Sequence, residues 1–212
     1  NWGEEQHIST SQEKTSKTGQ TINRTLSSVI HIRNQDIDIS PSEKNEPGHK
    51  YAEQHESINT LRGTIMHQML NHLSRQPQSK LAQFFSRDIS EINATDLASW
   101  WDECLAIINN DAFTHYFNSS EFDKFYNEVP LQFKEEDNNV YGIIDRLVIK
   151  DKNVTVIDYK THPYVNNDNI ESIAETYRKQ MQLYKTGVQL LWPDYTVTTK
   201  LLFTAIASEY TF

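Results

Sequence analysis

Hydrophobic and polar positions follow two different rhythms along the chain, a helical one first and a strand-like one later. Apolar residues recur at three- and four-residue intervals over residues 57–76 and 93–110, which predicts two amphipathic helices. Asn93 or Thr95 is the expected N-cap of the second helix. Shorter helical pieces are expected over residues 111–125.

Strand patterns begin after these helices. β-Branched and aromatic residues are concentrated in three runs, residues 128–134, 140–150 and 153–160. The polar turn Lys150-Asp151-Lys152-Asn153 separates the last two runs, so they are predicted to form a hairpin.

The chain then returns to a helical rhythm and closes with another strand pattern. An amphipathic helix is expected over residues 169–191, ended by Trp192-Pro193, and a last strand over residues 197–206. Helices followed by a hairpin, a helix and a strand indicate an α/β (α+β) domain with a central mixed β-sheet flanked by helices.

The first fifty residues differ in character from the rest. They are rich in Ser, Thr, Asn and Gln, contain one strand-like stretch from Ser27 to Ile32, and end in a turn-prone run. Residues 1–50 are therefore interpreted as a polar linker or tether, partly ordered, and residues 51–212 as the domain. The chain begins with Asn rather than Met, which suggests a fragment or a processed product.

Composition narrows the classes of function. No apolar run approaches the ~20 residues of a membrane helix, and the first stretch lacks the apolar segment of a secretory signal. Cys104 is the only cysteine, which excludes a disulfide framework or a cysteine-based zinc site within this chain and favours a cytoplasmic setting. The net charge of −9 disfavours tight passive binding of nucleic acid, but suits an enzyme whose carboxylates hold a divalent metal.

The predicted hairpin carries the candidate chemistry. If its strands pair symmetrically about the polar turn, Asp145 and Asp158 face each other, close enough to share one cation. Lys160 projects from the same face as Asp158 because strand side chains alternate with a period of two. Burying these charged groups costs desolvation free energy unless they are paired or bind a metal. Two interpretations are therefore open: an Asp–Lys ion pair at the end of the sheet, or a divalent-metal site. Two facing carboxylates with an in-phase lysine favour the metal site.

These residues also carry a family resemblance. Gly142-x-x-Asp145 followed by Ile157-Asp158-Tyr159-Lys160 resembles the core of the PD-(D/E)XK nuclease superfamily, and within it the RecB/AddA-type nuclease domain of bacterial helicase–nucleases. Three further elements resemble that subfamily and stand in its order: a GxxxH helix motif with Gly63 and His67, the acidic residue Glu128, and a QxxxY motif with Gln180 and Tyr184.

The resemblance implies a restriction-endonuclease-like core and a set of site residues. It implies that His67, Asp145 and Asp158, with the backbone carbonyl of Tyr159, hold Mg²⁺ or Mn²⁺. It further implies that Lys160 orients or activates the attacking water and stabilises charge on the phosphate. These assignments agree with the preference of hard cations for carboxylate and carbonyl oxygen.

Several of these residues have structural interpretations as well. A histidine such as His67 on a helix can be a satisfied core residue, and Glu128 can be a solvated strand residue. Gln180 and Tyr184 can belong to the core-facing stripe of the long helix. An amide such as that of Gln180, however, needs a hydrogen-bond partner on an apolar stripe. The resemblance suggests that Gln180 reaches the active site or the DNA backbone, with Tyr184 beside it. The family more often has a small residue at the position of His162, which leaves a role for His162 in doubt.

The function predicted from the sequence is that of a metal-dependent DNA nuclease domain, the nuclease part of a larger RecB/AddA-like helicase–nuclease in DNA repair or recombination. The chain has no GxxxxGK phosphate loop, so a helicase motor would lie in the parent polypeptide and deliver single-stranded DNA. A protein partner would be compatible with this hypothesis and a membrane is not expected. The alternatives are a catalytically silent nuclease-fold module that binds DNA or a partner protein, and an unrelated metal-dependent hydrolase.

Overall fold

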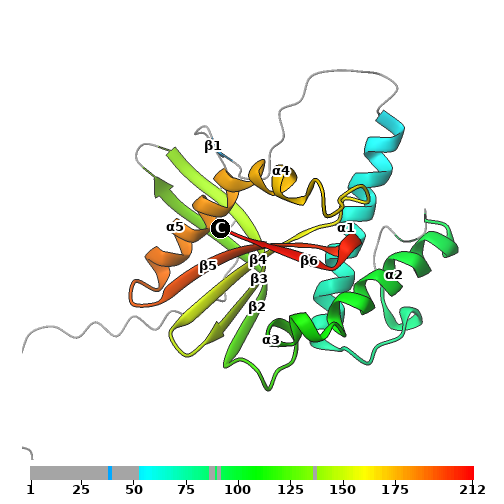
Figure 1. Cartoon of the computed structure of the whole chain (residues 1–212), viewed down its shortest axis with the longest axis horizontal. Coiled ribbons are helices and arrows are strands. Elements are labelled where there is room, and N and C mark those ends of the chain that lie inside the picture. The colour runs from blue at the N-terminus through cyan, green and yellow to red at the C-terminus, as the bar shows by residue number, and fades with distance from the viewer. Residues whose placement is uncertain (1–37, 40–52, 86–88, 90–91, 136–137) are drawn as a thin grey trace, which may run out of the picture. The chain divides into compact units, whose positions relative to one another are not determined.

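The computed structural model describes residues 38–39, 53–85, 89, 92–135 and 138–212 (Figure 1). The chain divides into two units, Asn1–Gln35 and Asp36–Phe212, and all of the described residues belong to the second. The strand expected from Ser27 to Ile32 and nearly all of the predicted linker lie outside the described residues. Among the described residues, none of the helices has the length and apolar character needed to cross a membrane.

The first half of the described chain is helical, as predicted. Its elements are α1 (Glu53–Arg75), the 3-10 turn η1 (Leu81–Gln83), α2 (Ala94–Ile108), the 3-10 turn η3 (Asp111–Phe113) and α3 (Thr114–Phe117). Asn93 is the N-cap of α2, since its side-chain oxygen accepts a hydrogen bond from the Asp96 backbone N–H at 2.8 Å. The predicted cap is confirmed, whereas α1 begins four residues before the expected start at residue 57.

The strands form one mixed sheet, which confirms the predicted fold class. They are β1 (Asp38–Ile39), β2 (Lys124–Glu135), β3 (Asn138–Lys150), β4 (Asn153–Lys160), β5 (Thr196–Phe203) and β6 (Ser208–Thr211). The sheet order is β1-β3-β4-β5-β6, with β2 paired to β3. The β2–β3, β3–β4 and β5–β6 pairs are antiparallel, whereas β1–β3 and β4–β5 are parallel.

Two expectations about the last third of the chain are wrong. The single helix expected over residues 169–191 is two helices, α4 (Ile170–Glu175) and α5 (Arg178–Leu191). The break follows from hydrogen bonds that close over three residues instead of four: Thr176 N–H donates to the Ile173 carbonyl at 3.1 Å and Tyr177 N–H to the Ala174 carbonyl at 2.9 Å.

The final strand also ends earlier than expected. β5 stops at Phe203, and the 3-10 turn η4 (Thr204–Ile206) leads to Ala207, which has a left-handed backbone (φ 46°). The chain reverses there and adds the short strand β6, which pairs with β5. An alanine at positive φ gives no sequence signal of the kind that a glycine would give.

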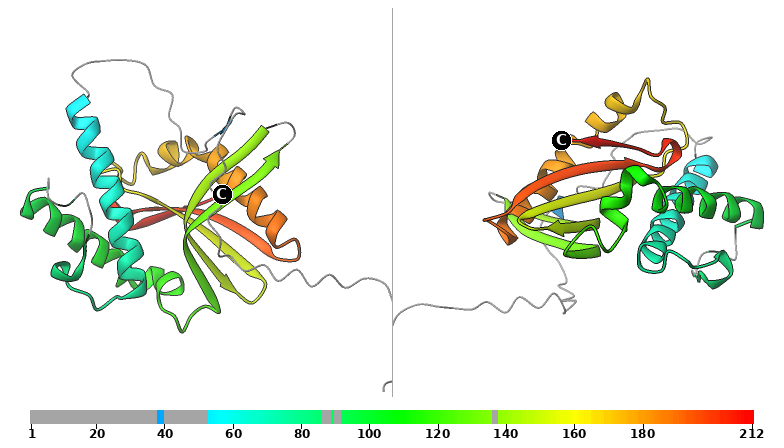
Figure 2. Two further views of the ribbon diagram at one scale, coloured as in Figure 1. Left: turned by 180° about the vertical axis from the view of Figure 1, so that it is seen from behind. Right: turned by 60° about the horizontal axis from the view of Figure 1, so that its bottom comes forward.

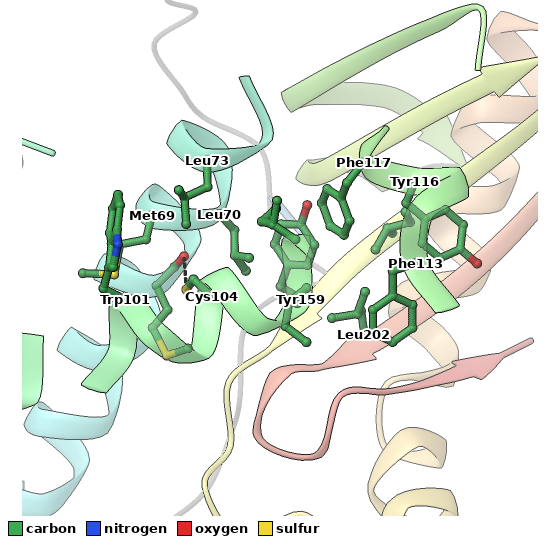
Figure 3. Packing of buried hydrophobic residues seen from close by; sticks show 14 of the residues in the cluster. Met69, Leu70, Leu73, Trp101, Cys104, Phe113, Tyr116, Phe117, Tyr159 and Leu202 are labelled. Atoms are coloured by element: carbon green, nitrogen blue, oxygen red, sulfur yellow. Dashed lines mark hydrogen bonds between the residues drawn. The ribbon is translucent and has the colours of Figure 1, made fainter. Parts of the chain in front are cut away.

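The two faces of the sheet pack against different helices (Figures 1 and 2). On one face, α1, α2 and α3 bury residues that include Met69, Leu70, Trp101 and Cys104 against Tyr159 and the neighbouring strands (Figure 3). The Cys104 thiol lies 3.8 Å from the Met66 carbonyl, so the single cysteine is part of this core.

On the other face, α5 packs along the sheet (Figure 2). Met181 and Val188 of α5 are fully buried against apolar residues of the strands, among them Ile144, Leu147 and Leu201. Gly187 allows this close approach, because a Cβ at that position would lie 2.6 Å from the Leu131 side chain.

The sheet forks at one point, and the fork positions the candidate site. The β3–β4 ladder has the predicted register but ends at Arg146↔Ile157. Beyond that pair β4 continues beside β5 as far as Lys160↔Phe203, while β3 continues beside β2.

Both β2 and β3 change face at the fork. In a regular strand, residues an even number of positions apart face the same side. In β2, however, Phe125 packs in the hydrophobic core formed with α1 and α2, whereas Val129 packs in the core formed with α5. In β3, Val148 and Ile144 differ in the same way. The change in β2 occurs at Glu128, whose φ of 52° is unusual for a strand residue.

Candidate active site

Asp145 lies at the fork, where it bonds to groups of two other elements. Its Oδ2 accepts a hydrogen bond from the Tyr159 backbone N–H at 2.7 Å, and its Oδ1 lies 3.0 Å from His67 Nδ1. The carboxylate thus bonds to a backbone N–H of β4 just where the β3–β4 ladder has ended. Asp145 is 8% exposed, so its charge is held inside the protein.

The predicted pairing of the two aspartates needs a correction. The register about the polar turn is as predicted, but Asp145 and Asp158 lie one step past the last bonded pair, Arg146↔Ile157. They therefore belong to separating strands rather than to one ladder. The physical reason is that the Tyr159 N–H bonds to the Asp145 side chain instead of a β3 carbonyl.

His67 lies on α1 and spans Asp145 and β4. In addition to the contact with Asp145, its Nε2 lies 3.1 Å from the Tyr159 carbonyl oxygen. Burial by itself would lower the pKa of His67, but the Asp145 carboxylate, its hydrogen bond and Asp158 raise it to about 9. The ring is therefore an imidazolium at neutral pH, and both nitrogens can donate.

Gly63 lies where α1 faces the end of β4. It is one turn before His67, and a Cβ at this position would be in van der Waals contact with the Thr161 hydroxyl, at 3.4 Å. Arg62, next to it, donates to the Thr161 carbonyl and, at 2.6 Å, to Glu103 of α2. No role for Arg62 was predicted from the sequence; its contacts indicate that it fixes α1 against both neighbours.

Lys160 and Asp158 lie on the same face of β4, as the strand period predicts, and they form the ion pair that the sequence left as the alternative to a metal site. Lys160 Nζ lies 2.5 Å from Asp158 Oδ2, and Asp158 is 4% exposed. Burial raises the pKa of Asp158 and the nearby Asp145 carboxylate adds to the shift, while Lys160 opposes it. For Lys160, burial lowers the pKa but Asp158 outweighs this effect, so the ammonium form is favoured.

Residues of α5 and of the preceding turn surround the lysine. Gln180 Oε1 accepts a hydrogen bond from Lys160 Nζ at 3.3 Å, and the Gln180 amide donates to the Tyr184 hydroxyl at 3.3 Å. The Tyr184 hydroxyl donates to the Ile143 carbonyl of β3 at 2.7 Å. The Tyr177 ring lies under the ammonium, with Nζ 3.9 Å from the ring centroid.

Glu128 brings a third carboxylate to the fork. In the β2–β3 register it stands opposite Asp145, between the pairs Asn127↔Arg146 and Val129↔Ile144. Burial raises its pKa, and the Asp145 charge raises it further. Glu128 also lines a cavity of about 490 Å³, whose other walls are all on α1: Gly63, Thr64, His67, Gln68 and Asn71.

The structure thus brings the predicted site residues together from five elements. Glu128, Asp145, Asp158, Lys160 and the Tyr159 carbonyl lie at the fork, with His67 on one side and Gln180 and Tyr184 on the other. Sequence reasoning missed the contact between Tyr177 and Lys160, because residues 169–191 were expected to form one continuous helix.

The chemistry of these groups suits a hard divalent cation. Carboxylate and backbone carbonyl oxygens are ligands of such ions, and His67 already contacts one of each, the Asp145 carboxylate and the Tyr159 carbonyl. As the side chains stand, no group of three His, Cys, Asp or Glu in the described ranges could hold an ion. The cationic groups nearest to the carboxylates are His67 and Lys160.

Comparison with known proteins gives the class of the chain. A family model of the PD-(D/E)XK nuclease superfamily matches residues 45–210, so the chain belongs to that superfamily. The resemblance found in its motifs is thereby confirmed.

More particularly, the chain is similar to bacterial helicase–nuclease subunits. It is 27% identical over 139 residues to an ATP-dependent helicase/nuclease subunit of Streptococcus mutans, covering 59% of this chain and 11% of that protein. The corresponding subunit of Staphylococcus haemolyticus is 23% identical over 150 residues, covering 61% of this chain and 12% of that protein. The chain thus spans about a tenth of the length of these relatives. The structural match to a Vibrio cholerae protein of known structure covers 73% of this chain and 44% of the Vibrio cholerae chain, with 11% sequence identity and a TM-score of 0.31.

Proposed function

We propose that this domain is a metal-dependent deoxyribonuclease that hydrolyses phosphodiester bonds. The observation that carries the proposal is the convergence at the fork of three carboxylates, from β2, β3 and β4, with a lysine and a histidine. Membership of the PD-(D/E)XK nuclease superfamily supports it.

Asp145, Asp158, His67 and the carbonyl of Tyr159 would hold the cation, Mg²⁺ or Mn²⁺. When bound, such an ion supplies a Lewis acid for the phosphate and lowers the pKa of attacking water. In the absence of metal, His67 and Lys160 offset the buried negative charge. Metal binding would therefore compete with the His67 proton and loosen the Lys160–Asp158 ion pair.

Lys160 is proposed to act on the transition state. Its ammonium is held by Asp158, Gln180 and the Tyr177 ring, so it needs little reorganisation to stabilise negative charge on the phosphate. Gln180 and Tyr184 are proposed to position Lys160, since they connect it to the Ile143 carbonyl. Glu128, which lines the cavity beside His67, is proposed to contribute to the metal site.

The domain is further proposed to be the nuclease part of a larger helicase–nuclease in DNA repair or recombination. The names of the similar proteins support this. A motor in the parent polypeptide would deliver single-stranded DNA to the site and raise its local concentration, which a chain with a net charge of −9 needs. A further protein partner would be compatible with this arrangement.

A nuclease assay on linear and circular DNA tests the proposed activity. We expect cleavage by the chain with Mg²⁺ or Mn²⁺, none with EDTA, and none by Asp145→Asn in either metal. Binding of DNA without cleavage under all of these conditions would instead identify a catalytically silent module.

The delivery hypothesis needs a separate measurement. DNA affinity of this chain is compared at matched salt, in Ca²⁺, with that of a complete helicase–nuclease polypeptide that contains it. We expect the complete polypeptide to bind more tightly, and equal, tight binding by the isolated chain would contradict delivery.

A further inference from the structure

Three aromatic rings form a row that ends at Lys160. Tyr164 stacks on His162 with centroids 6.0 Å apart and an interplanar angle of 25°, and His162 stacks on Tyr177 at 6.0 Å and 22°. His162 Nε2 lies 2.5 Å from the Tyr177 hydroxyl, which fixes the order of the inner two rings. The row Tyr164–His162–Tyr177, which we call the aromatic row, thus runs outward from the site lysine, from Tyr177 at the start of α5 to His162 and Tyr164 in the segment after β4.

The outer ring of the row is presented to solvent by a braced loop. Tyr164 is 61% exposed, while the next residue, Val165, is 4% exposed and packs in the hydrophobic core formed by α5 and the sheet. The Asn169 amide donates to the Tyr164 carbonyl at 3.1 Å, and the Asn166 backbone N–H donates to the Asn169 side chain at 2.8 Å. The backbone that carries the ring is therefore held in place before any ligand arrives, and the ring itself rests on His162, which lowers the entropy that binding would lose.

The loop that carries Tyr164 offers no lysine or arginine side chain to a phosphate. Residues 161–169 contain no Lys or Arg and do contain Asp168, while Lys160 lies at the inner end of the row. A phosphate is therefore expected at Lys160 rather than on the outer part of this loop. An exposed aromatic ring next to a proposed phosphodiester site suits the uncharged part of a nucleic acid, since each base has a π-face that stacks on such rings.

We propose that the aromatic row is a base-stacking platform, on which Tyr164 receives a nucleobase of single-stranded DNA that flanks the phosphate at Lys160. This inference rests on the proposed function and deepens it by assigning a base-binding residue. A duplex would not use the platform, because its bases are already stacked on one another. Contacts of this kind also give affinity that does not depend on positive charge, which suits a chain with a net charge of −9.

Equilibrium binding in EDTA tests the platform without cleavage. The probe is fluorescein-labelled oligothymidylate, and the readout is anisotropy of the probe with the 212-residue chain. Tyr164→Ala should weaken binding roughly 5- to 100-fold, the range that loss of one base–aromatic stack produces. Tyr164→Phe keeps the ring and should bind as the wild type does. Phe85→Ala, which removes an 87% exposed ring outside the row, is the matched control and should change nothing.

A backbone without bases separates stacking from a structural role of the loop. An abasic oligomer of the same length should bind weakly and equally to wild type and Tyr164→Ala, and duplex DNA should also be indifferent to the substitution. An equal loss with the thymidylate and abasic probes would overturn the proposal, as would a Tyr164→Ala protein that binds oligothymidylate normally or a wild type that does not bind it at all.

The outcomes also separate this inference from the nuclease proposal. Metal-dependent cleavage with no effect of Tyr164→Ala on oligothymidylate binding would leave the nuclease and remove the platform. Tyr164-dependent binding by a chain that never cleaves would support the platform and remove the nuclease.

Discussion

Two neighbouring residues of β3, Asp145 and Arg146, begin two very different clusters of buried charge. The Arg146 guanidinium is fully buried and donates to the Tyr116 carbonyl from Nε (2.9 Å) and Nη2 (2.7 Å) and to Asn127 Oδ1 from Nη1 (2.7 Å). It also lies 4.9 Å and 4.7 Å from the centroids of the Phe117 and Phe125 rings. All of these partners are neutral groups whose positions are set by the fold.

The cluster around Asp145 is built on a different principle. It gathers three carboxylates, of Glu128, Asp145 and Asp158, against two cationic side chains, and it opens onto the cavity beside α1. Its negative charge is in excess, and one of the cations is a titratable histidine. The difference teaches that a buried charge surrounded by neutral acceptors serves the fold, whereas an excess of one sign beside a cavity marks a place for an exchangeable ligand.

The largest expected effect is on cleavage, and it distinguishes the two clusters most sharply. Asp158→Asn should reduce cleavage below detection, because the proposed metal site loses a charged ligand. Its free energy of unfolding, measured by urea titration, should change far less than in Arg146→Ala. An Asp158→Asn protein that cleaves DNA at the wild-type rate would remove Asp158 from the site.

Arg146→Ala should have the largest effect on stability. It leaves the Tyr116 carbonyl and Asn127 without donors and opens a cavity between phenylalanine rings, so we expect a loss of about 3–5 kcal/mol in the free energy of unfolding. Arg146→Lys keeps the charge but has a single donor group in place of the planar fork, and should lose less. Equal stability of Arg146→Ala and wild type would contradict the structural role of this cluster.

Lys160→Ala should slow cleavage by ~10²-fold, the effect of removing one preorganised electrostatic group. Mn²⁺ affinity by calorimetry should be retained, since the ammonium is not a ligand. Lys200 is the matched control, because it too has an ion pair, with Glu209 at 2.5 Å, and a tyrosine ring, Tyr116, at 5.6 Å. Lys200→Ala should cleave at the wild-type rate, and a similar loss in both variants would indicate that Lys160 matters only for structure.

The smallest expected effect is that of His67→Ala on thermal stability. We expect weaker Mn²⁺ binding by calorimetry and a smaller fall in melting temperature than in His72→Ala, because the His67 side chain is 31% exposed and its partners can be solvated through the cavity. His72, five residues along α1, packs near Phe84 and Trp101 and is the control. His72→Ala should lower the melting temperature and leave Mn²⁺ affinity unchanged. A large fall in melting temperature with unchanged Mn²⁺ affinity in His67→Ala would instead identify His67 as a core histidine.

Local rules of the chain were sufficient for the hairpin and for the relation of Asp158 to Lys160. A short polar turn sets the register of the strands that it joins, and the period of two places alternate side chains on one face. The Asn93 cap was predictable for the same reason, since its hydrogen bond to Asp96 closes within three residues. The order of the motifs was enough to identify the superfamily.

Tertiary structure alone decided how these local pieces meet. The fork arises because β3 parts from β4 after Arg146↔Ile157 and continues beside β2, while β4 stays paired with β5, a parallel strand about forty residues further along the chain. Nothing in the hairpin encodes where its two strands separate. The stacking of His162 on Tyr177, the contact of Tyr177 with Lys160 and the hydrogen bond between Lys160 and Gln180 join elements that are separate in sequence. The spacing of residues along a strand is set by its own backbone geometry, but the partner that a side chain meets across a gap is set by the packing of the whole domain.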